Sequence, residues 1–317
     1  MLAMNGVLLI DKPAGMTSHD VVARVRKIIG ERRVGHTGTL DPFATGLLVV
    51  LAGRATRLAQ FLSGAEKEYE AVIRFGYATD TGDVTGVRIE LESHAKTRSA
   101  QSLPKEEIEA AMAGLRGEIE QVPPMYSAKK IQGKKLYEFA RAGQSVERHP
   151  VRVTIREFEM WAPADELLSA NDDGSVDLRV RVLCSAGTYI RTLAEDLGQK
   201  LGIGSHLAEL RRTRAGAFQI NGALTLERLA EVCKLEILDD ALVSPYSALS
   251  HLPEIELDTE QARRTMHGLA LEFAPDGPPS LTDGDAIRLS LNNELIAVGR
   301  FDASQSVIHP EVVLRTE

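Results

Sequence analysis

The chain has 317 residues, of which 44% are hydrophobic and 26% are charged, an ordinary globular composition with enough apolar material for one large domain or two. It opens with no basic segment followed by an apolar one, and no uncharged apolar run could span a bilayer. We therefore expect a cytoplasmic protein with no signal peptide and no membrane segment. The two cysteines, Cys184 and Cys233, lie far apart among apolar neighbours, which argues against a disulfide framework or a zinc site.

The net charge of −8 is distributed unevenly along the chain. Residues 1–230 carry 31 Lys and Arg against 29 Asp and Glu, whereas residues 231–317 carry 6 against 16. A polyanion would therefore bind to residues 1–230, where basic residues cluster. The clusters are Arg24, Arg26 and Lys27; Arg32 and Arg33; Lys129, Lys130, Lys134 and Lys135; and Arg211, Arg212 and Arg214. Each cluster taken alone is more often a solvated face than a phosphate site.

The first elements are a strand, a helix and an apolar run. Residues 7–10 are apolar and precede a turn at Gly15, which predicts a buried strand. Thr17 offers an N-cap oxygen to an amphipathic helix that we expect to end at Gly30. Residues 47–51 form a second apolar run.

The middle of the chain mixes strands and helices. Residues 69–76 alternate apolar and polar side chains and predict a half-buried strand. Residues 123–143 are basic and contain paired prolines, which predicts an excursion from the core. The other predicted elements are helices over residues 105–115 and 188–201 and strands over Val151–Met160 and Val176–Cys184. Because no regular βαβ rhythm appears, we expect an α/β or α+β fold with a sheet of mixed direction.

The last part of the chain is predicted to form a small β-rich unit. The charge changes near residue 231, and Pro-containing stretches follow at residues 244–253, which marks a boundary. Short alternating strands are expected over Ala286–Leu291 and residues 295–301, with Asn292 and Asn293 between them.

One segment, residues 35–46, carries the candidate chemistry, and we call it the Asp41 loop. It contains three Gly, three Thr and one Pro in twelve residues, so it cannot be a regular helix or a central strand. It holds one carboxylate, Asp41, and one imidazole, His36, between apolar flanks, which is a usual setting for catalytic residues. No metal-ligand cluster accompanies them, and the segment lacks a P-loop ending. By itself the pattern is better explained by a capped turn before Pro42 with a packed histidine.

Further motifs identify a resemblance. The Asp41 loop reads Gly-His-Thr-Gly-Thr-Leu-Asp-Pro-Phe-Ala-Thr-Gly and resembles the signature of the TruB family, bacterial enzymes that convert uridine 55 in the tRNA T-loop to pseudouridine. Five more blocks resemble that family in order: residues 9–18, residues 67–69 with 79–83, residues 123–137, residues 184–191 and residues 207–213. Six ordered blocks over about residues 5–215 make the resemblance highly specific.

The resemblance implies an architecture and a set of partners. Residues 1–247 are expected to form a pseudouridine-synthase catalytic domain, whose mixed, mostly antiparallel sheet is flanked by helices and loops. A thumb insertion that grips RNA is expected at about residues 123–145, and a PUA-like domain at residues 248–317. The implied enzyme is a monomer that acts on the T-arm of tRNA without a metal, another cofactor or a protein partner. The acidic C-terminal part, however, suits a phosphate contact poorly.

The resemblance also assigns catalytic roles. The isomerisation breaks the C1′–N1 bond, turns the base and forms a C1′–C5 bond, and a carboxylate can attack carbon and leave again. Asp41 takes this role, either by attacking the sugar or by first promoting loss of a sugar proton. Burial alone would raise the pKa of Asp41, so a cation is needed, and the resemblance supplies Arg191. Tyr69 matches the tyrosine that stacks on the base and transfers a proton; by periodicity alone it is a core aromatic.

Substrate contacts follow in the same way. The target uridine must be flipped out of a folded loop, at a cost of a few kcal/mol that contacts in the site recover. The resemblance implies that His36 contacts the RNA at the place the flipped bases leave, and that the target base meets a further set of residues: Tyr189, Leu210, Asp80 and Lys12. The implied thumb contacts are Tyr126, Lys129, Lys130 and Lys134, in a stretch suited to phosphates and exposed bases.

Two other functions fit the same fold. One is an RNA chaperone or tRNA-binding protein without catalysis, which the presence of Asp41, Tyr69 and Arg191 argues against. The other is an enzyme working within a guide-RNA particle, which the bacterial type of thumb and the lack of a long basic tail argue against.

Overall fold

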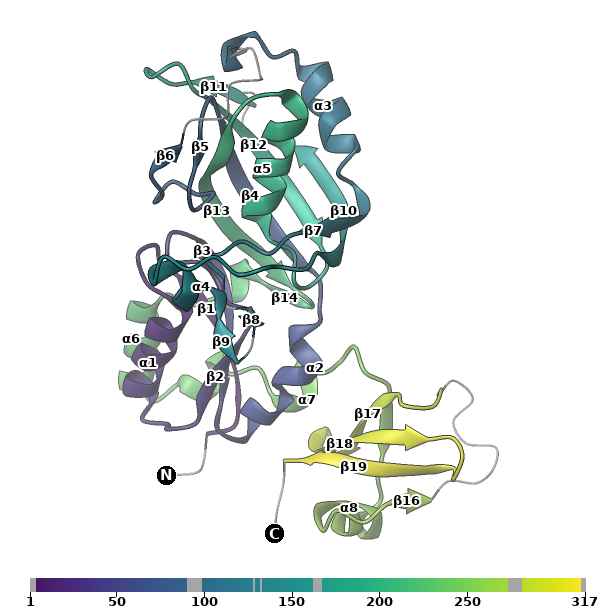
Figure 1. Cartoon of the computed structure of the whole chain (residues 1–317). Coiled ribbons are helices and arrows are strands. Elements are labelled where there is room, and N and C mark those ends of the chain that lie inside the picture. Colours follow the sequence, from purple (N-terminus) through teal and green to yellow (C-terminus); the bar gives the residue numbers. More distant parts are fainter. Residues whose placement is uncertain are drawn as a thin grey trace.

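The computed structural model describes residues 4–89, 99–127, 129–131, 133–161, 167–272 and 281–314. The larger of its two main sheets has ten strands (Figure 1), with β1-β3-β13-β4-β12-β10-β7 as the main order and β2, β11 and β14 beside β3, β12 and β13. Its strands are β1 (Gly6–Lys12), β2 (Val34–Thr37), β3 (Thr45–Ala52), β4 (Lys67–Phe75), β7 (Gly117–Gln121), β10 (Val151–Met160), β11 (Leu168–Ala170), β12 (Val176–Cys184), β13 (Ser205–Ala215) and β14 (Phe218–Gln219). Within this sheet, the β13–β3 pair is parallel and the other pairs are antiparallel. The predicted mixed, mostly antiparallel sheet is confirmed.

Helices lie against this sheet and beside it. They are α1 (Ser18–Ile29), α2 (Ala59–Ser63), α3 (Lys105–Ala113), α4 (Leu136–Arg141), α5 (Ile190–Leu201), α6 (Leu226–Lys234) and α7 (Pro245–Ala248). α1 begins at the predicted Thr17 cap, which forms a capping box with Asp20, and ends at Gly30 in the left-handed conformation. α3 and α5 cover one face of the sheet (Figure 1). No helix in the described ranges is long and apolar enough to cross a membrane.

The apolar runs of β1 and β3 are continuous because both of their faces are covered. Val7 and Leu9 join one buried cluster, whereas Leu8 and Ile10 join the other. A strand buried on both sides shows no alternation of polar residues. By contrast, β4 and β12 alternate: one side faces the core under α5, and the other side is more exposed.

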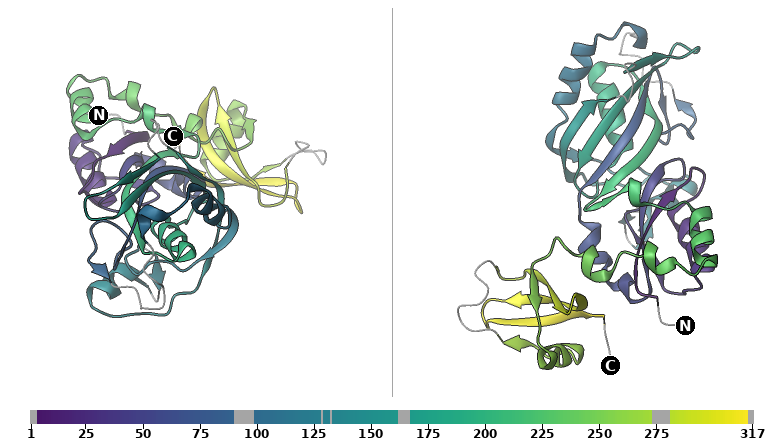
Figure 2. Two further views of the ribbon diagram at one scale, coloured as in Figure 1. Left: turned by 90° about the horizontal axis from the view of Figure 1, so that it is seen from above. Right: turned by 180° about the vertical axis from the view of Figure 1, so that it is seen from behind.

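The C-terminal part forms the predicted β-rich unit. Its sheet has the order β15-β17-β18-β19-β16, and α8 (Thr259–Met266) packs on it. The strands are β15 (Glu254–Glu256), β16 (Leu271–Glu272), β17 (Ala286–Leu291), β18 (Glu294–Asp302) and β19 (Val307–Val313). Asn292 and Asn293 both have positive φ and form the hairpin turn. This unit (Figure 2) contacts η1 (Gly53–Leu58), the 3-10 helix that follows β3. There, Arg54 donates a hydrogen bond to the Leu314 carbonyl at 2.8 Å.

One central strand was not predicted. β13 carries Arg211, Arg212 and Arg214, and two bulges interrupt its pairing with β4, so its sequence shows no period of two. The arginines are not a free basic surface, contrary to the expected phosphate cluster. Arg211 forms a two-pronged ion pair with Asp11 at 2.7 and 3.0 Å, and Arg212 is 1% exposed.

The parallel junction of β3 and β13 depends on Gly46. Gly46 has φ +98°, and a Cβ there would overlap the backbone oxygen of Arg212 and lie 2.8 Å from its nitrogen. We expect Gly46→Ala to lower the free energy of unfolding by about 3 kcal/mol or more, because strain and overlap add. Gly64→Ala is the matched control, since nothing lies within 4 Å of a Cβ there. Equal denaturation midpoints for the two variants would contradict this account.

Candidate active site

A cavity of about 240 Å³ opens where the Asp41 loop meets β4, β13 and the start of α5. Four predicted residues from separate parts of the chain line it together: Asp41, Tyr69, Arg191 and Leu210. Tyr189 and the thumb residue Lys129 lie at its wall as well. The lining is completed by Gly38, Thr39, Leu40, Ser63, Lys67, Ser127, Ser185, Gly187, Thr188, Ile190 and Arg212. Among the described residues, no group of three or more His, Cys, Asp or Glu is placed to hold a metal ion.

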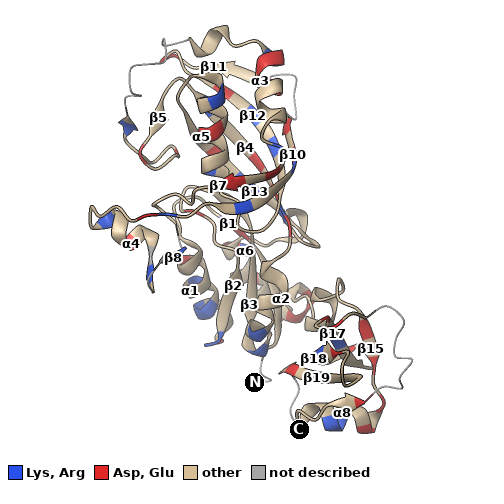
Figure 3. Cartoon of the chain, turned by 45° about the vertical axis from the view of Figure 1, so that its right-hand side comes forward, with Lys and Arg blue, Asp and Glu red and all other residues tan. Residues whose placement is uncertain are grey.

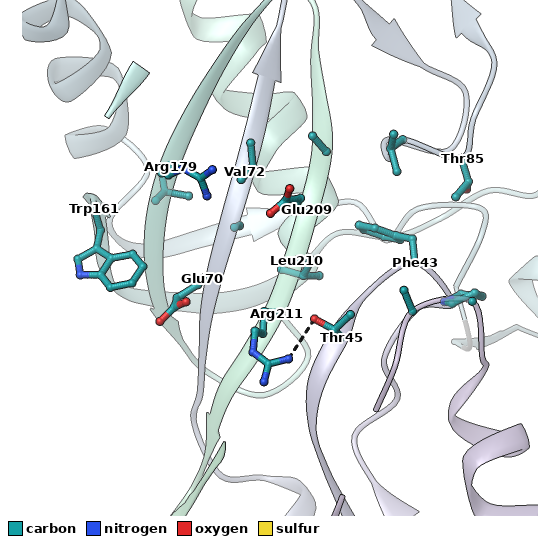
Figure 4. Close-up of a pocket in the computed structure, with 17 residues that line it drawn as sticks. Phe43, Thr45, Glu70, Val72, Thr85, Trp161, Arg179, Glu209, Leu210 and Arg211 are labelled. Atoms are coloured by element: carbon teal, nitrogen blue, oxygen red, sulfur yellow. Dashed lines mark hydrogen bonds between the residues drawn. The ribbon is translucent and has the colours of Figure 1, made fainter. Parts of the chain in front are cut away.

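A larger cavity of about 610 Å³ lies along the other face of the same strands (Figure 4). Glu70 and Arg211 line it, and they alternate along β4 and β13 with Tyr69 and Arg212, which line the smaller cavity. Of the predicted site residues, Leu210 alone lines both cavities. The candidate chemistry therefore belongs to the smaller cavity.

Asp41 and Arg191 form the polar centre of this cavity. The Arg191 Nε lies 2.9 Å from Asp41 Oδ2, and the side chains are 5% and 32% exposed respectively. Burial raises the pKa of Asp41 above its ordinary value, while the charge and hydrogen bond of Arg191 act in the opposite direction. Asp41 thus keeps an open side toward the cavity, and Arg191 favours its charged form.

Arg191 is fixed from three directions. It donates to the backbone oxygens of Thr81 at 2.8 Å and of Tyr126 at 2.6 Å. Its Nη1 also lies 3.7 Å from Oδ2 of Asp83, which is 6% exposed. The Tyr126 contact joins the base of the thumb to the candidate active site.

In the motif at residues 79–83, the aspartate that lies beside Arg191 is Asp83. It is not Asp80, the residue of this motif that we expected in the site. Asp80 is exposed and accepts a hydrogen bond from the Val87 amide at 2.8 Å. Asp83 accepts from Thr81 and Thr85 while it faces Arg191. The motif places two aspartates three residues apart, and only the turn geometry distinguishes them. The contact of Asp80 with the base stays a prediction.

Tyr69, Leu210 and Tyr189 form the less polar walls. Tyr69 is 8% exposed, and burial raises the pKa of its hydroxyl. Tyr189 directly precedes α5. Its amide donates to the side-chain oxygen of Gln121 at 2.9 Å, and its carbonyl accepts from the side-chain nitrogen of Gln121 at 3.2 Å. Gln121, the last residue of β7, is 1% exposed, and no sequence pattern singled it out.

Lys12 lies behind the Asp41 loop instead of in the cavity wall. It is 0% exposed, and its ammonium donates to the carbonyls of Ala44 at 2.6 Å, Pro13 at 2.8 Å and Pro42 at 3.2 Å. Burial lowers the pKa of Lys12 to about 8. Lys12 therefore positions the backbone that follows Asp41.

His36 lies on β2, outside the residues that line the small cavity. Its ring packs edge-on against His19 of α1, with 5.6 Å between centroids, and its buried Nδ1 has no hydrogen-bond partner in the described part of the chain. Burial, with the nearby His19 and Arg212, lowers the pKa of His36 to about 4. His36 is thus neutral near pH 7 and suits a hydrogen bond to RNA better than a phosphate contact.

The thumb forms a short hairpin and a helix: β8 (Lys130–Ile131), β9 (Lys134–Lys135) and α4. The Leu136 amide donates to the Lys129 carbonyl at 2.9 Å, and the Lys134 ammonium lies 6.0 Å from the Phe139 ring centroid. The ribbon segments of α4 and α1 that carry Lys and Arg lie on the same side of the molecule (Figure 3). This placement agrees with the predicted excursion; an RNA contact of Tyr126, Lys129, Lys130 or Lys134 stays a prediction.

Comparisons with known proteins show which family the chain is similar to. A family model described as "TruB family pseudouridylate synthase (N terminal domain)" matches residues 26–190, and one described as "tRNA pseudouridylate synthase B C-terminal domain" matches residues 191–249. The chain is 45% identical over 270 residues to a Bacillus cytotoxicus protein named tRNA pseudouridine synthase B, covering 85% of each. A protein of the same name from Geobacillus thermodenitrificans is 43% identical over 91% of this chain and 94% of its own.

Solved structures show the same fold. A chain in a Cbf5-Nop10-Gar1 complex matches with a TM-score of 0.72 and 27% identity, over 98% of this chain and 85% of that one. A chain of an H/ACA RNP bound to a substrate RNA containing 2′-deoxyuridine matches with a TM-score of 0.70 and 26% identity, over 98% and 85%.

Proposed function

Because the chain belongs to the TruB family of pseudouridylate synthases, we propose that it converts uridine 55 in the T-loop of tRNA to pseudouridine. The observation that carries this proposal is the ion pair between Asp41 and Arg191 at the wall of a cavity that also contains Tyr69. The relatives' names support tRNA as the substrate.

In the proposed reaction, the target nucleotide is flipped into the cavity so that its sugar meets the free side of Asp41. The C1′–N1 bond breaks with its electron pair leaving on the base, either as the Asp41 carboxylate attacks C1′ or after a sugar proton is lost. The base then turns and C5 bonds to C1′ as the bond between Asp41 and C1′ breaks, or as the sugar regains its proton. The C5 proton is lost, and N1 of the product takes up a proton. Arg191 keeps Asp41 ionised, and Tyr69 stacks on the base and takes part in proton transfer.

The other parts of the chain complete the proposal. Residues 1–247 act as the catalytic domain, with a thumb at about residues 123–145 that closes on the T-arm. Residues 248–317 act as a PUA-like domain. The enzyme works in the cytoplasm as a monomer, with no cofactor and no protein partner.

A pair of T-arm hairpins that differ at one position tests this function. With the hairpin that contains uridine at position 55, nucleoside analysis should show one pseudouridine per RNA. The control hairpin, with cytidine at that position, should bind equally well but give none. Tight binding of both hairpins without pseudouridine would instead favour an RNA chaperone on the same fold.

A further inference from the structure

Three buried cations surround the Asp41 loop without a carboxylate partner. Lys12, Lys67 and Arg212 are 0%, 6% and 1% exposed. None of them forms an ion pair with an acidic residue in the described part of the chain. Their donors instead go to backbone oxygens: Lys67 to Ser63 and Ala65, and Arg212 to Leu47 and Gly38. Buried charges are normally paired, because removing them from water is costly.

Two of these cations, Lys67 and Arg212, line the cavity itself. Both side chains approach Gly38 from one direction: a Cβ at Gly38 would lie 3.4 Å from Arg212 Nη1 and 3.7 Å from Lys67 Cε. They extend from β4 and β13, where Tyr69 is the Cα partner of Arg212. The cavity wall therefore carries the ion pair of Asp41 and Arg191 and also, beside Gly38 and Tyr69, the two cations Lys67 and Arg212, which we call its positive end.

The side chains near the positive end do not balance its charge. Burial raises the pKa of Tyr69 and raises that of the Cys184 thiol to about 11, so both stay neutral. Asp41 is bonded to Arg191. Lys67 itself remains largely protonated near pH 7, because its burial lowers its pKa only to about 8. An anion of the substrate at this end would balance its charge.

We infer that Lys67 and Arg212 form an anion-stabilising end of the cavity that holds the negative charge appearing on the base when the C1′–N1 bond breaks. This inference rests on the proposed function. Heterolysis leaves the electron pair of the C1′–N1 bond on the uracil ring, which becomes an anion before C5 bonds to C1′. Fixed cations in a water-poor site stabilise such developing charge without reorganising during the reaction. Tyr69, stacked on the base, would hold the ring beside them.

Lys67→Met and Lys67→Arg test the inference, with Lys67→Met removing the charge and Lys67→Arg retaining it. Under single-turnover conditions, Lys67→Met should lower the rate of pseudouridine formation about 10²- to 10³-fold, as expected for loss of one charge-stabilising donor. Lys67→Arg should recover most of this loss. The tRNA dissociation constant should stay unchanged in both. Lys105→Met is the control, because Lys105 is exposed at the start of α3. Circular dichroism melts establish that each variant is folded.

A second substrate separates charge stabilisation from a structural role of Lys67. Fluorine at C5 stabilises the base anion, so with 5-fluorouridine at the target position the rate of glycosidic cleavage should differ less than about tenfold between wild type and Lys67→Met. An equal loss for uridine and 5-fluorouridine would overturn the inference. So would a defect confined to tRNA affinity, which would assign these cations to an RNA phosphate. Because wild type is assayed beside the variants, its own inactivity would identify failure of the proposed function instead.

Discussion

Replacing Asp41 with asparagine is expected to abolish pseudouridine formation while tRNA binding persists. The change keeps the size of the side chain but removes the charge and the nucleophilic oxygen, so the rate should fall by about 10⁴-fold or more. The fold should survive, since the Asp41 side chain is 32% exposed and faces the cavity. Release of tritium from tRNA labelled at C5 of uridine measures the rate, and filter binding measures the affinity.

Asp172→Asn is the matched control for this substitution. Asp172 carries the same charge but is exposed in the turn between β11 and β12, and it lines neither cavity. We expect its rate to lie within about threefold of wild type, because exposed substitutions have small effects. Substantial turnover by Asp41→Asn, or an equal loss in the two variants, would remove Asp41 from the centre of the mechanism.

Arg191→Met is also expected to lower the rate strongly, and that effect should depend on pH. Breaking a buried ion pair by removing one partner costs about 3–5 kcal/mol. Burial already raises the pKa of Asp41, and the charge of Arg191 opposes that rise. Without Arg191 the pKa rises further, so a smaller fraction of Asp41 is ionised near pH 7. We expect a rate loss of about 10²-fold or more at neutral pH.

The sign of the pH dependence distinguishes this account from simple misfolding. Activity requires the carboxylate and is lost as the pH falls through the pKa of Asp41. In Arg191→Met this acid limb should move to higher pH, and activity should partly recover as the pH is raised. Arg191→Lys keeps the charge but not the fixed fork of donors. Its acid limb should therefore lie between those of wild type and Arg191→Met. An acid limb at the wild-type position would show that Arg191 does not control the ionisation of Asp41.

The elements with strong local signals were predictable from the sequence. The residues that cap α1, Thr17 and Gly30, were both predicted from the sequence. The C-terminal hairpin turns at Asn292 and Asn293 as expected. The motifs also predicted that Asp41 and Arg191, distant in sequence, would meet, and their side chains are 2.9 Å apart.

Other features depended on tertiary contacts that leave no local pattern. β13 lies in the middle of the sheet although its arginines and bulges hide its alternation, because Asp11 and backbone oxygens meet those charges from other strands. For the same reason, Arg212 seemed to belong to a surface cluster. Asp83 and Asp80 could be told apart only after the turn between them was known. Lys12 was expected beside the base. Its ammonium instead donates to three backbone oxygens, two of which belong to the Asp41 loop.

In the proposed function, the cavity around Asp41 isomerises one uridine of tRNA. The decisive experiment maps every pseudouridine at nucleotide resolution in an unmodified tRNA transcript after incubation with wild type or Asp41→Asn. We expect pseudouridine at position 55 alone with wild type and at no position with Asp41→Asn. Pseudouridine at another position, or the same modification by both proteins, would rule out the proposed function.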